Sequence, residues 1–243
     1  LPILFGGLSS SRRAPRLLAG SMLEGGLAGV AFAGDVRLVS RVTQGCQAVG
    51  PRRRIDEADG NVVLKLDGDA ALDCLLADLG VDPARLSEAI PRLRTTLAGL
   101  SDPLAPPERP GPFDADTRMR HLLGIDPARG GVVLAQAVEP GTLLSFCRRD
   151  AQAARRDLMR ICAEIRDEVT PGVQYPGLST ATPADPVQHI AGAIYISCTG
   201  RGGPHFGAPS AELQLVQHAL GDVPLVGFFA AGEIAHNHLY GYT

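Results

Sequence analysis

The residues best suited to bind a ligand lie near the end of the sequence. Cys198 follows an apolar run and leads into the turn Thr199-Gly200-Arg201-Gly202-Gly203. Glycines let backbone amides come close to a ligand, and Arg201 offers a planar, permanently charged fork for a carboxylate or phosphate. The turn therefore predicts a site for a small anion, with Arg201 as the main anchor. The alternative is a tight turn with a structural arginine, and burial of Arg201 against a carboxylate of the protein would favour that alternative.

Cys198 raises a second question, which is whether its thiol is a nucleophile. A guanidinium close to a thiol favours the thiolate, so Arg201 could activate it. The competing interpretation is a small buried side chain that closes a strand, because free cysteines are among the most buried residues. A cysteine hydrolase also needs a positioned base, for which His205 is the nearest candidate. These residues do not make a catalytic set, and we expect a binding protein rather than an enzyme.

A third pattern is Glu233-x-x-His236-x-His238. Three such side chains can hold zinc or iron if the backbone brings them together. The alternative is a polar rim in a loop, which the neighbouring Gly232 and Asn237 favour. We therefore assign no metal, and keep His205, His236 and His238 as the candidate ligands should one bind.

Composition excludes several classes of protein. The chain has 243 residues, is 45% hydrophobic and carries a formal charge of −3, so it can fill a core and has no electrostatic reason to bind nucleic acid. No apolar run reaches the 18 or so residues that a membrane-spanning helix needs. The five cysteines form no CxxC pair, which argues against a disulfide framework and favours the reducing cytoplasm.

The first part of the chain alternates strand and helix patterns. We expect a strand over 2–5 that ends at Gly6-Gly7, and a hairpin formed by 27–32 and 36–42. A strand over 61–66 precedes a helix that Asp69 caps and Gly80 ends. A second helix is expected between 82 and 100, bracketed or kinked by two prolines.

The later part begins after a proline-rich stretch at 101–116, which we interpret as a linker or long loop. A second hairpin is expected from 131–138 and 142–147, and Asp150 caps the clearest amphipathic helix of the chain. The remaining expected elements are a strand over 191–198, a helix over 210–220 and a very buried strand over 224–231. The fold class is therefore α/β, with α+β as the alternative, and with two similar sheet-and-helix halves packed together.

Five ordered motifs in the last third resemble the C-terminal module of the FIST family. They are Gly192-Ala-Ile-Tyr-Ile-Ser-Cys198, the turn Thr199-Gly-Arg-Gly202, Val223-Pro-Leu-Val-Gly-Phe-Phe229, Gly232-Glu-Ile234 and Leu239-Tyr-Gly-Tyr-Thr243. The first part is similar to the N-terminal FIST module through Gly29-Val-Ala-Phe32, Gln44-Gly-Cys46, Val49-Gly-Pro51 and Leu66-Asp-Gly-Asp-Ala-Ala-Leu72. The resemblance divides the chain into an N-terminal module at 1–100, a linker at 101–116 and a C-terminal module at 117–243. The opening of the first module and the final strand of the second do not match, and we expect both to be missing.

The FIST family is named for F-box and intracellular signal transduction proteins. The resemblance implies a cytoplasmic sensory module that binds a small ligand and signals by conformational change to a protein partner such as a kinase or cyclase. We expect one ligand cleft lined by residues from both halves: Gln44, Cys46, Cys198, Gly200, Arg201, Gly202, Glu233 and Tyr240. A protein-interaction scaffold is the main alternative. Some relatives sense nitric oxide through haem, so haem is a further alternative here, although no haem-ligating histidine can be matched.

Overall fold

The computed structural model describes residues 4–102, 113, 117–169, 190–236 and 238–241. Strands and helices both occur, as the expected α/β class requires. The chain divides into two compact units, and neither is a single stretch of sequence. Unit 1 consists of Leu1–Val42 with Arg155–Leu239, and unit 2 of Thr43–Ala154 with Tyr240–Thr243. The expected modules at 1–100 and 117–243 do not coincide with these units, and most of the expected linker lies outside the described residues.

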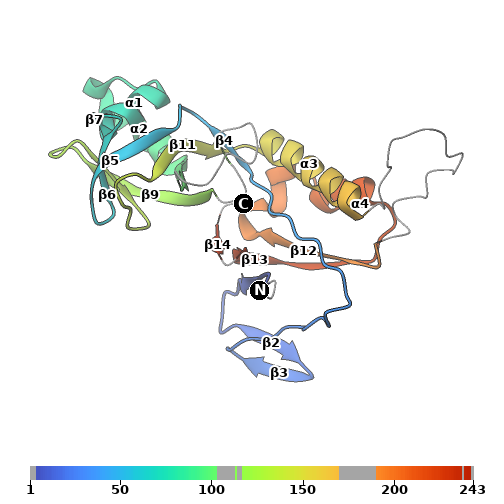
Figure 1. The fold of residues 1–243 in the computed structure, drawn as a ribbon. Helices are drawn as coiled ribbons and strands as arrows, with labels where there is room; N and C mark the ends of the chain where they lie inside the picture. Colours follow the sequence, from blue (N-terminus) through green and yellow to red (C-terminus); the bar gives the residue numbers. More distant parts are fainter. Residues whose placement is uncertain (1–3, 103–112, 114–116, 170–189, 237, 242–243) are drawn as a thin grey trace, which may run out of the picture. The chain divides into compact units, whose positions relative to one another are not determined.

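Unit 2 is built on a closed ring of antiparallel strands (Figure 1). The pairing order is β10-β9-β8-β11-β5-β6, and β6 pairs again with β10. Two short strands extend the ring, since β4 pairs with β11 and β7 with β6. The bounds are Cys46–Ala48 (β4), Arg53–Asp59 (β5), Val62–Leu66 (β6), Asp69–Ala70 (β7), Thr96–Ser101 (β8), Arg118–Asp126 (β9), Gly131–Leu134 (β10) and Leu143–Arg149 (β11).

The strand pairing in the ring shows that one expected hairpin is wrong and that one expected strand is correct. Residues 131–138 and 142–147 were expected to form a hairpin, but β10 pairs with β9 and β6, whereas β11 pairs with β8, β5 and β4. Each therefore has its partners elsewhere in the ring. The expected strand at 61–66 is confirmed as β6. The main core contains completely buried side chains from several ring strands, including Ile55, Leu100 and Phe146.

Two helices belong to unit 2. The first, α1 (Ala71–Leu79), ends as expected at Gly80, whose φ of 62° is the left-handed conformation that glycine adopts easily. The predicted start of α1 was wrong by one residue, because the capping position is Ala70 and not Asp69. The second segment begins with a short 3₁₀ turn at Pro83–Arg85 and continues as α2 (Leu86–Thr95). Residues 96–100 are not helical: they form β8, whose residues are all buried.

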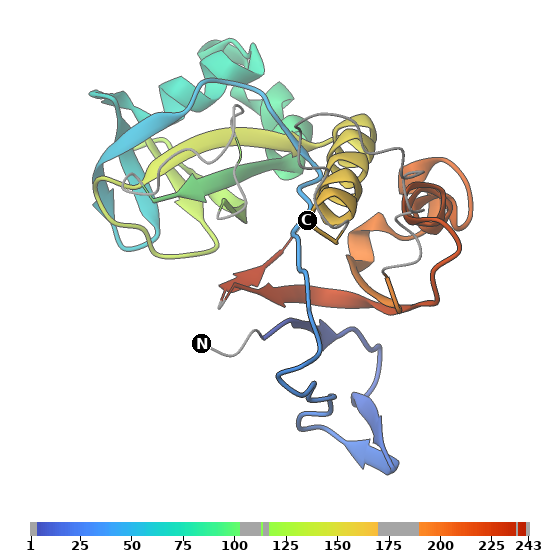
Figure 2. The same ribbon diagram turned by 45° about the vertical axis from the view of Figure 1, so that its right-hand side comes forward.

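Unit 1 contains a smaller sheet in which β12 (Ala193–Cys198) runs parallel to β13 (Leu225–Ala235). On the other side, β13 pairs with β1 (Gly6–Ser9), and β14 (His238–Tyr240) also pairs with it. Figure 2 shows α3 (Ala151–Val169) and α4 (Ala211–Leu220) on one side of β12 and β13. The expected cap of α3 is confirmed, because Asp150 Oδ1 accepts a hydrogen bond of 2.6 Å from the amide of Ala153.

Several expectations for unit 1 are wrong. The glycines at 6 and 7 lie inside β1 and do not end a strand. Gly7 suits this position because it has no side chain: a Cβ there would come within 2.6 Å of Ala230 Cβ on β13. The hairpin over 27–32 and 36–42 does not form, and Leu27 is 93% exposed. A hairpin occurs earlier, between β2 (Arg16–Ala19) and β3 (Ser21–Glu24).

The strand expected to be the most buried, over 224–231, is largely exposed. It forms the first part of β13, on which Val226 and Phe228 share one face and are both exposed. The helices cover the other side of the strand, where Leu225 packs in the core formed with Leu158 and Val216. The apolar run indicated burial on both faces, but the described residues bury only one.

Candidate functional site

A buried polar cluster surrounds Glu212 in unit 1. Tyr195 and Ser197 alternate on β12, so their side chains leave the strand on the same face. Tyr195 Oη donates to Glu212 Oε1 over 2.6 Å, and Ser197 Oγ donates to Glu212 Oε2 over 2.9 Å. Arg201, in the 3₁₀ turn Thr199–Arg201, adds a hydrogen bond of 2.8 Å from Nη1 to Oε1. We call these four residues the Glu212 cluster.

The Glu212 cluster explains how a carboxylate and a guanidinium are tolerated inside the protein. A buried charge is costly unless it is paired and hydrogen-bonded, and the carboxylate here accepts three hydrogen bonds, one from a cation. The Arg201 guanidinium also lies 5.8 Å from the centre of the Phe206 ring. Burial raises the pKa of Tyr195 above its ordinary value, so its phenol keeps its proton and serves as a donor.

This arrangement corrects the expected role of Arg201. The anchor role required that Arg201 not be buried against a carboxylate of the protein. Its side chain is 1% exposed, that of Glu212 is 8% exposed, and the two are paired. The charge of Arg201 therefore joins the end of β12 to the first turn of α4, and Arg201 is an architectural residue in this structure.

The residues next to Arg201 in sequence also make contacts within the protein. Cys198 is buried at the end of β12, opposite Ala230 of β13. Gly202 follows the 3₁₀ turn and donates its amide to the carbonyl of Thr199. His205 lies in a second 3₁₀ turn, Gly203–Phe206, where its ring packs edge-on against Phe206. The positions fit a compact turn that closes the strand.

The Glu233, His236 and His238 pattern lies at the end of β13 and the start of β14. Glu233 is buried and pairs in register with Gly7 of β1. His236 has a positive φ of 48°, and its carbonyl oxygen lies 2.8 Å from His238 Nδ1. Within the residues that the structure describes, no three His, Cys, Asp or Glu side chains are grouped closely enough to hold a metal ion.

The other expected cleft residues belong to unit 2. Gln44 is buried, and its Nε2 donates to the carbonyl of Thr117 over 3.0 Å. Cys46 packs in a small core with Met119 and Cys147, whose sulfur atoms are 3.6 Å apart. A hydrogen bond with the Cys46 thiol, together with burial, raises the pKa of Cys147. Tyr240 is also buried and belongs to unit 2.

The expected ligand set is thus divided between the units. Gln44, Cys46 and Tyr240 lie in unit 2, and the others, Cys198, Gly200, Arg201, Gly202 and Glu233, lie in unit 1. Six of these eight residues are buried, and the exceptions are the two glycines. Their assembly into one cleft stays a prediction.

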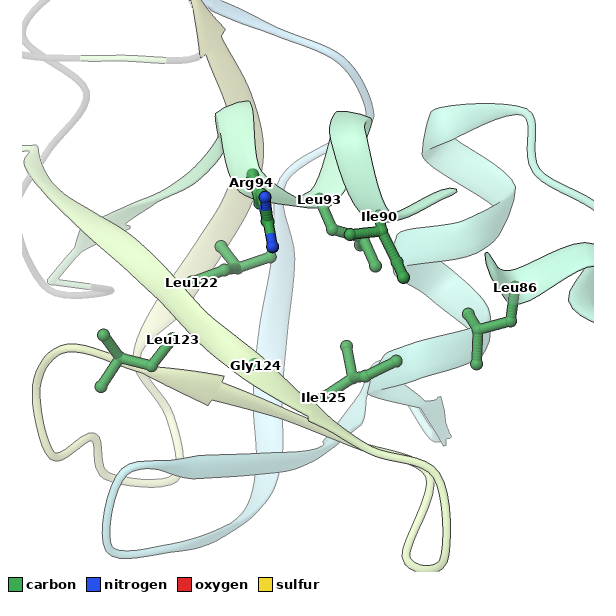
Figure 3. Close-up of a pocket in the computed structure, with 8 residues that line it drawn as sticks. All are labelled: Leu86, Ile90, Leu93, Arg94, Leu122, Leu123, Gly124 and Ile125. Carbon is green, nitrogen blue, oxygen red and sulfur yellow. The ribbon is translucent and has the colours of Figure 1, made fainter. Parts of the chain in front are cut away.

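A pocket that sequence reasoning missed lies within unit 2, between α2 and β9 (Figure 3). It has a volume of about 400 Å³ and a mainly aliphatic wall formed by Leu86, Ile90, Leu93, Arg94, Leu122, Leu123, Gly124 and Ile125. One signal was present in the sequence, because Leu86, Ile90 and Leu93 have the i, i+4, i+7 spacing of one helix face. The opposite wall could not be anticipated, since no strand was expected over 118–126.

Comparison with known protein families identifies the family of this chain. The family model of the FIST N domain matches residues 1–69, and that of the FIST C domain matches residues 71–236. The chain belongs to the FIST family. FIST domains are sensory domains of signal transduction.

Curated relatives of this FIST protein occur in mycobacteria. The uncharacterized protein Rv0628c of Mycobacterium tuberculosis is 34% identical over 227 residues, which cover 91% of this chain and 53% of that protein. The uncharacterized protein Mb0898c of Mycobacterium bovis is 31% identical over the same length, with the same coverage. The chain spans about half the length of the curated relatives it matches. No solved structure matches it.

The FIST matches do not follow the compact units. The FIST N match at 1–69 includes all of the first stretch of unit 1 and also β4, β5 and β6 of unit 2. The FIST C match at 71–236 likewise has residues in both units. No described helix of this FIST protein is both long and apolar enough to cross a membrane.

Proposed function

We propose that this FIST chain is a cytoplasmic sensory region that binds a small anionic ligand and changes the conformation of a signalling protein. Two kinds of observation support the proposal. The chain carries both FIST domains, which are sensory. The observation that carries ligand binding is the α2–β9 pocket, whose volume of about 400 Å³ lies within the range of small-molecule sites, roughly 300–1,000 Å³.

The pocket is suited to transmit a signal because one of its walls belongs to the closed ring. Leu122 to Ile125 lie on β9, which pairs with both β8 and β10. A ligand that binds one arrangement of α2 and β9 better than another would favour that arrangement over the alternatives. The ring offers a direct route from the pocket to the rest of unit 2.

The residues expected from sequence enter the proposal in a changed form. The other expected ligand contacts stay predictions, and they are Gln44, Cys46, Cys198, Gly200, Gly202, Glu233 and Tyr240. Arg201 is not retained as the anion anchor, because its guanidinium is paired with Glu212 inside unit 1.

The test is a thermal-shift screen of the intact chain. A ligand that binds only the native state raises the melting temperature, and the stabilisation grows with the logarithm of one plus the ratio of ligand concentration to dissociation constant. The panel contains amino acids, nucleotides, aliphatic carboxylates, their uncharged analogues and hemin, and hemin binding is read separately from a Soret band. We expect one anionic class to raise the melting temperature. A panel without any stabilising compound would oppose the proposal.

A second candidate function, protein interaction, is favoured by the exposed face of the unit 1 sheet. Ile194 of β12 is in register with Val226 of β13, and Ile196 is in register with Phe228. Val226 is 68% exposed and Phe228 is 47% exposed. Neighbouring exposed apolar residues on one face are typical of interaction surfaces. Self-association measured by analytical ultracentrifugation, and its loss in Val226→Lys, would support this function, whereas a monomer at high concentration would oppose a self-associating surface.

A further inference from the structure

The walls of the α2–β9 pocket restrict the chemistry of its occupant. Among the lining residues that the structure describes, all except Arg94 and Gly124 are leucine or isoleucine. These side chains offer no hydrogen-bond partner and no aromatic surface on which a base or a ring could stack. The body of a ligand that fills this space must therefore be apolar, and an aliphatic chain matches the lining best.

Arg94 adds one charged group to this apolar surface. It lies in the last turn of α2, and Figure 3 shows its side chain beside Leu122. Among the described residues, no hydrogen bond or ion pair engages its guanidinium. Two other arginines of unit 2 differ in this respect: Arg53 is paired with Asp78, and Arg92 Nη1 donates to the carbonyl of Leu79. The guanidinium of Arg94 is thus available to an anion from outside the protein.

We infer that the α2–β9 pocket binds an aliphatic carboxylate, with the hydrocarbon chain between α2 and β9 and the carboxylate on Arg94. This inference rests on the proposed ligand-binding function and names its ligand class. An arginine binds a carboxylate through two parallel hydrogen bonds, which would fix the head of the ligand. Burial of each additional methylene strengthens binding about fourfold, so chain length governs affinity until the pocket is full.

The test compares three probes on the intact chain by isothermal titration calorimetry. Sodium dodecanoate, below its micellar concentration, carries both the chain and the head group. Dodecanol keeps the chain without the charge, and hexanoate keeps the charge with half the chain. We expect dodecanoate to bind at least tenfold more tightly than dodecanol. With six methylenes fewer, hexanoate should bind more than a hundredfold more weakly than dodecanoate.

Two variants locate the site. Arg94→Gln should weaken dodecanoate at least tenfold and leave dodecanol unchanged, whereas Arg12→Gln, which removes the same charge from an exposed position of unit 1, should affect neither. Gly124→Val should weaken both probes by occupying part of the cavity. A Cβ at Gly124 meets no atom within 4 Å, so this variant should fold normally, which its melting temperature would verify.

The outcomes separate this inference from the proposed function. If dodecanoate fails to bind while another compound of the thermal-shift panel stabilises the chain, the ligand class is wrong and the sensory proposal stands. If no compound binds, both are wrong. Dodecanoate binding that is equal in the parent, Arg94→Gln and Gly124→Val would place the ligand elsewhere and overturn the inference. Tight binding of an apolar helical peptide, with none of dodecanoate, would make the pocket a docking groove instead.

Discussion

Arg201 Nη1 lies 2.8 Å from Glu212 Oε1, and the two side chains are 1% and 8% exposed. The pair links the 3₁₀ turn after β12 to the first turn of α4, and Tyr195 and Ser197 complete the hydrogen bonds of the carboxylate. Arg201, although it lies in a glycine-rich turn, thus stabilises the fold and is paired inside the protein. Its role can be tested without knowledge of any ligand.

Removal of the carboxylate should strongly destabilise the protein. Glu212→Ala leaves the guanidinium of Arg201 buried without its partner, and the loss of one member of a buried pair costs about 3–5 kcal/mol. Urea unfolding followed by circular dichroism measures the change. Glu24→Ala, at an exposed position of β3, is the control and should stay within about 0.5 kcal/mol of the parent. A midpoint for Glu212→Ala equal to that of the control would contradict the structural role.

Arg201→Lys distinguishes the two roles of the arginine more sharply. Lysine keeps the charge but lacks the planar group that fills this position, so the free energy of unfolding should fall by at least about 1 kcal/mol. An anchor for an external anion would behave in the opposite way, with unchanged stability and weaker ligand binding. Denaturation and calorimetry on the same preparation therefore separate the roles.

Gly50 should tolerate no side chain. A Cβ at this position would lie 2.0 Å from Cγ of Asp78, which accepts hydrogen bonds of 2.6 Å and 2.7 Å from Arg53. Gly50→Ala must displace that carboxylate, and we expect a loss of about 1–3 kcal/mol in the free energy of unfolding. Gly124→Ala, where a Cβ meets no atom within 4 Å, should be neutral or stabilising. Equal stability of the two variants would refute this account of Gly50.

Local patterns in the sequence predicted the helices better than the sheets. The apolar stripe that ends at Gly80 and the acidic cap at Asp150 each depend on a few neighbouring residues, and α1 and α3 formed where they indicated. The closed ring depends on contacts distant in sequence, such as those between Leu97 and His121 and between Val63 and Val132. Periodicity cannot identify such partners, which is why two hairpins were placed wrongly.

The candidate site shows the same limit. The family could be recognised from ordered motifs such as Gln44-Gly-Cys46 and Gly232-Glu-Ile234. The partner of Arg201 could not be predicted from the sequence. Glu212 lies in the first turn of a separate helix and resembles an ordinary acidic residue at a helix start. The α2–β9 pocket was missed because one of its walls, β9, lacked a recognisable strand pattern.

The cysteines should react slowly in the native protein. All five are buried, and burial raises the pKa of Cys162 to about 11, so little thiolate is present at neutral pH. We expect slow reaction with Ellman's reagent at pH 7.5 and rapid release of five equivalents in urea. Cys198→Ser tests the nucleophile hypothesis directly. One thiol that reacts rapidly in the parent and is lost in Cys198→Ser would restore that hypothesis.

His121 should make the protein less stable as the pH falls below neutrality. It lies on β9 opposite Leu97, and burial, followed by the positive charge of Arg149, lowers its pKa below the ordinary 6.5. The unfolded chain therefore binds more protons than the folded one as the pH falls through 6.5 toward the folded-state pKa. The free energy of unfolding that the neutral His121 contributes above pH 6.5 is therefore lost as the pH falls from 6.5 to the folded-state pKa.

Urea unfolding at several pH values between about 7.5 and 5.5 isolates this effect, because ordinary carboxylates, with pKa values near 4, titrate mainly below the window. The free energy of unfolding should decrease toward pH 5.5 in the parent and decrease less in His121→Gln. His218→Gln, at an exposed position of α4, should keep the pH dependence of the parent. The same slope in His121→Gln and the parent would show that another group controls the acid sensitivity of the fold.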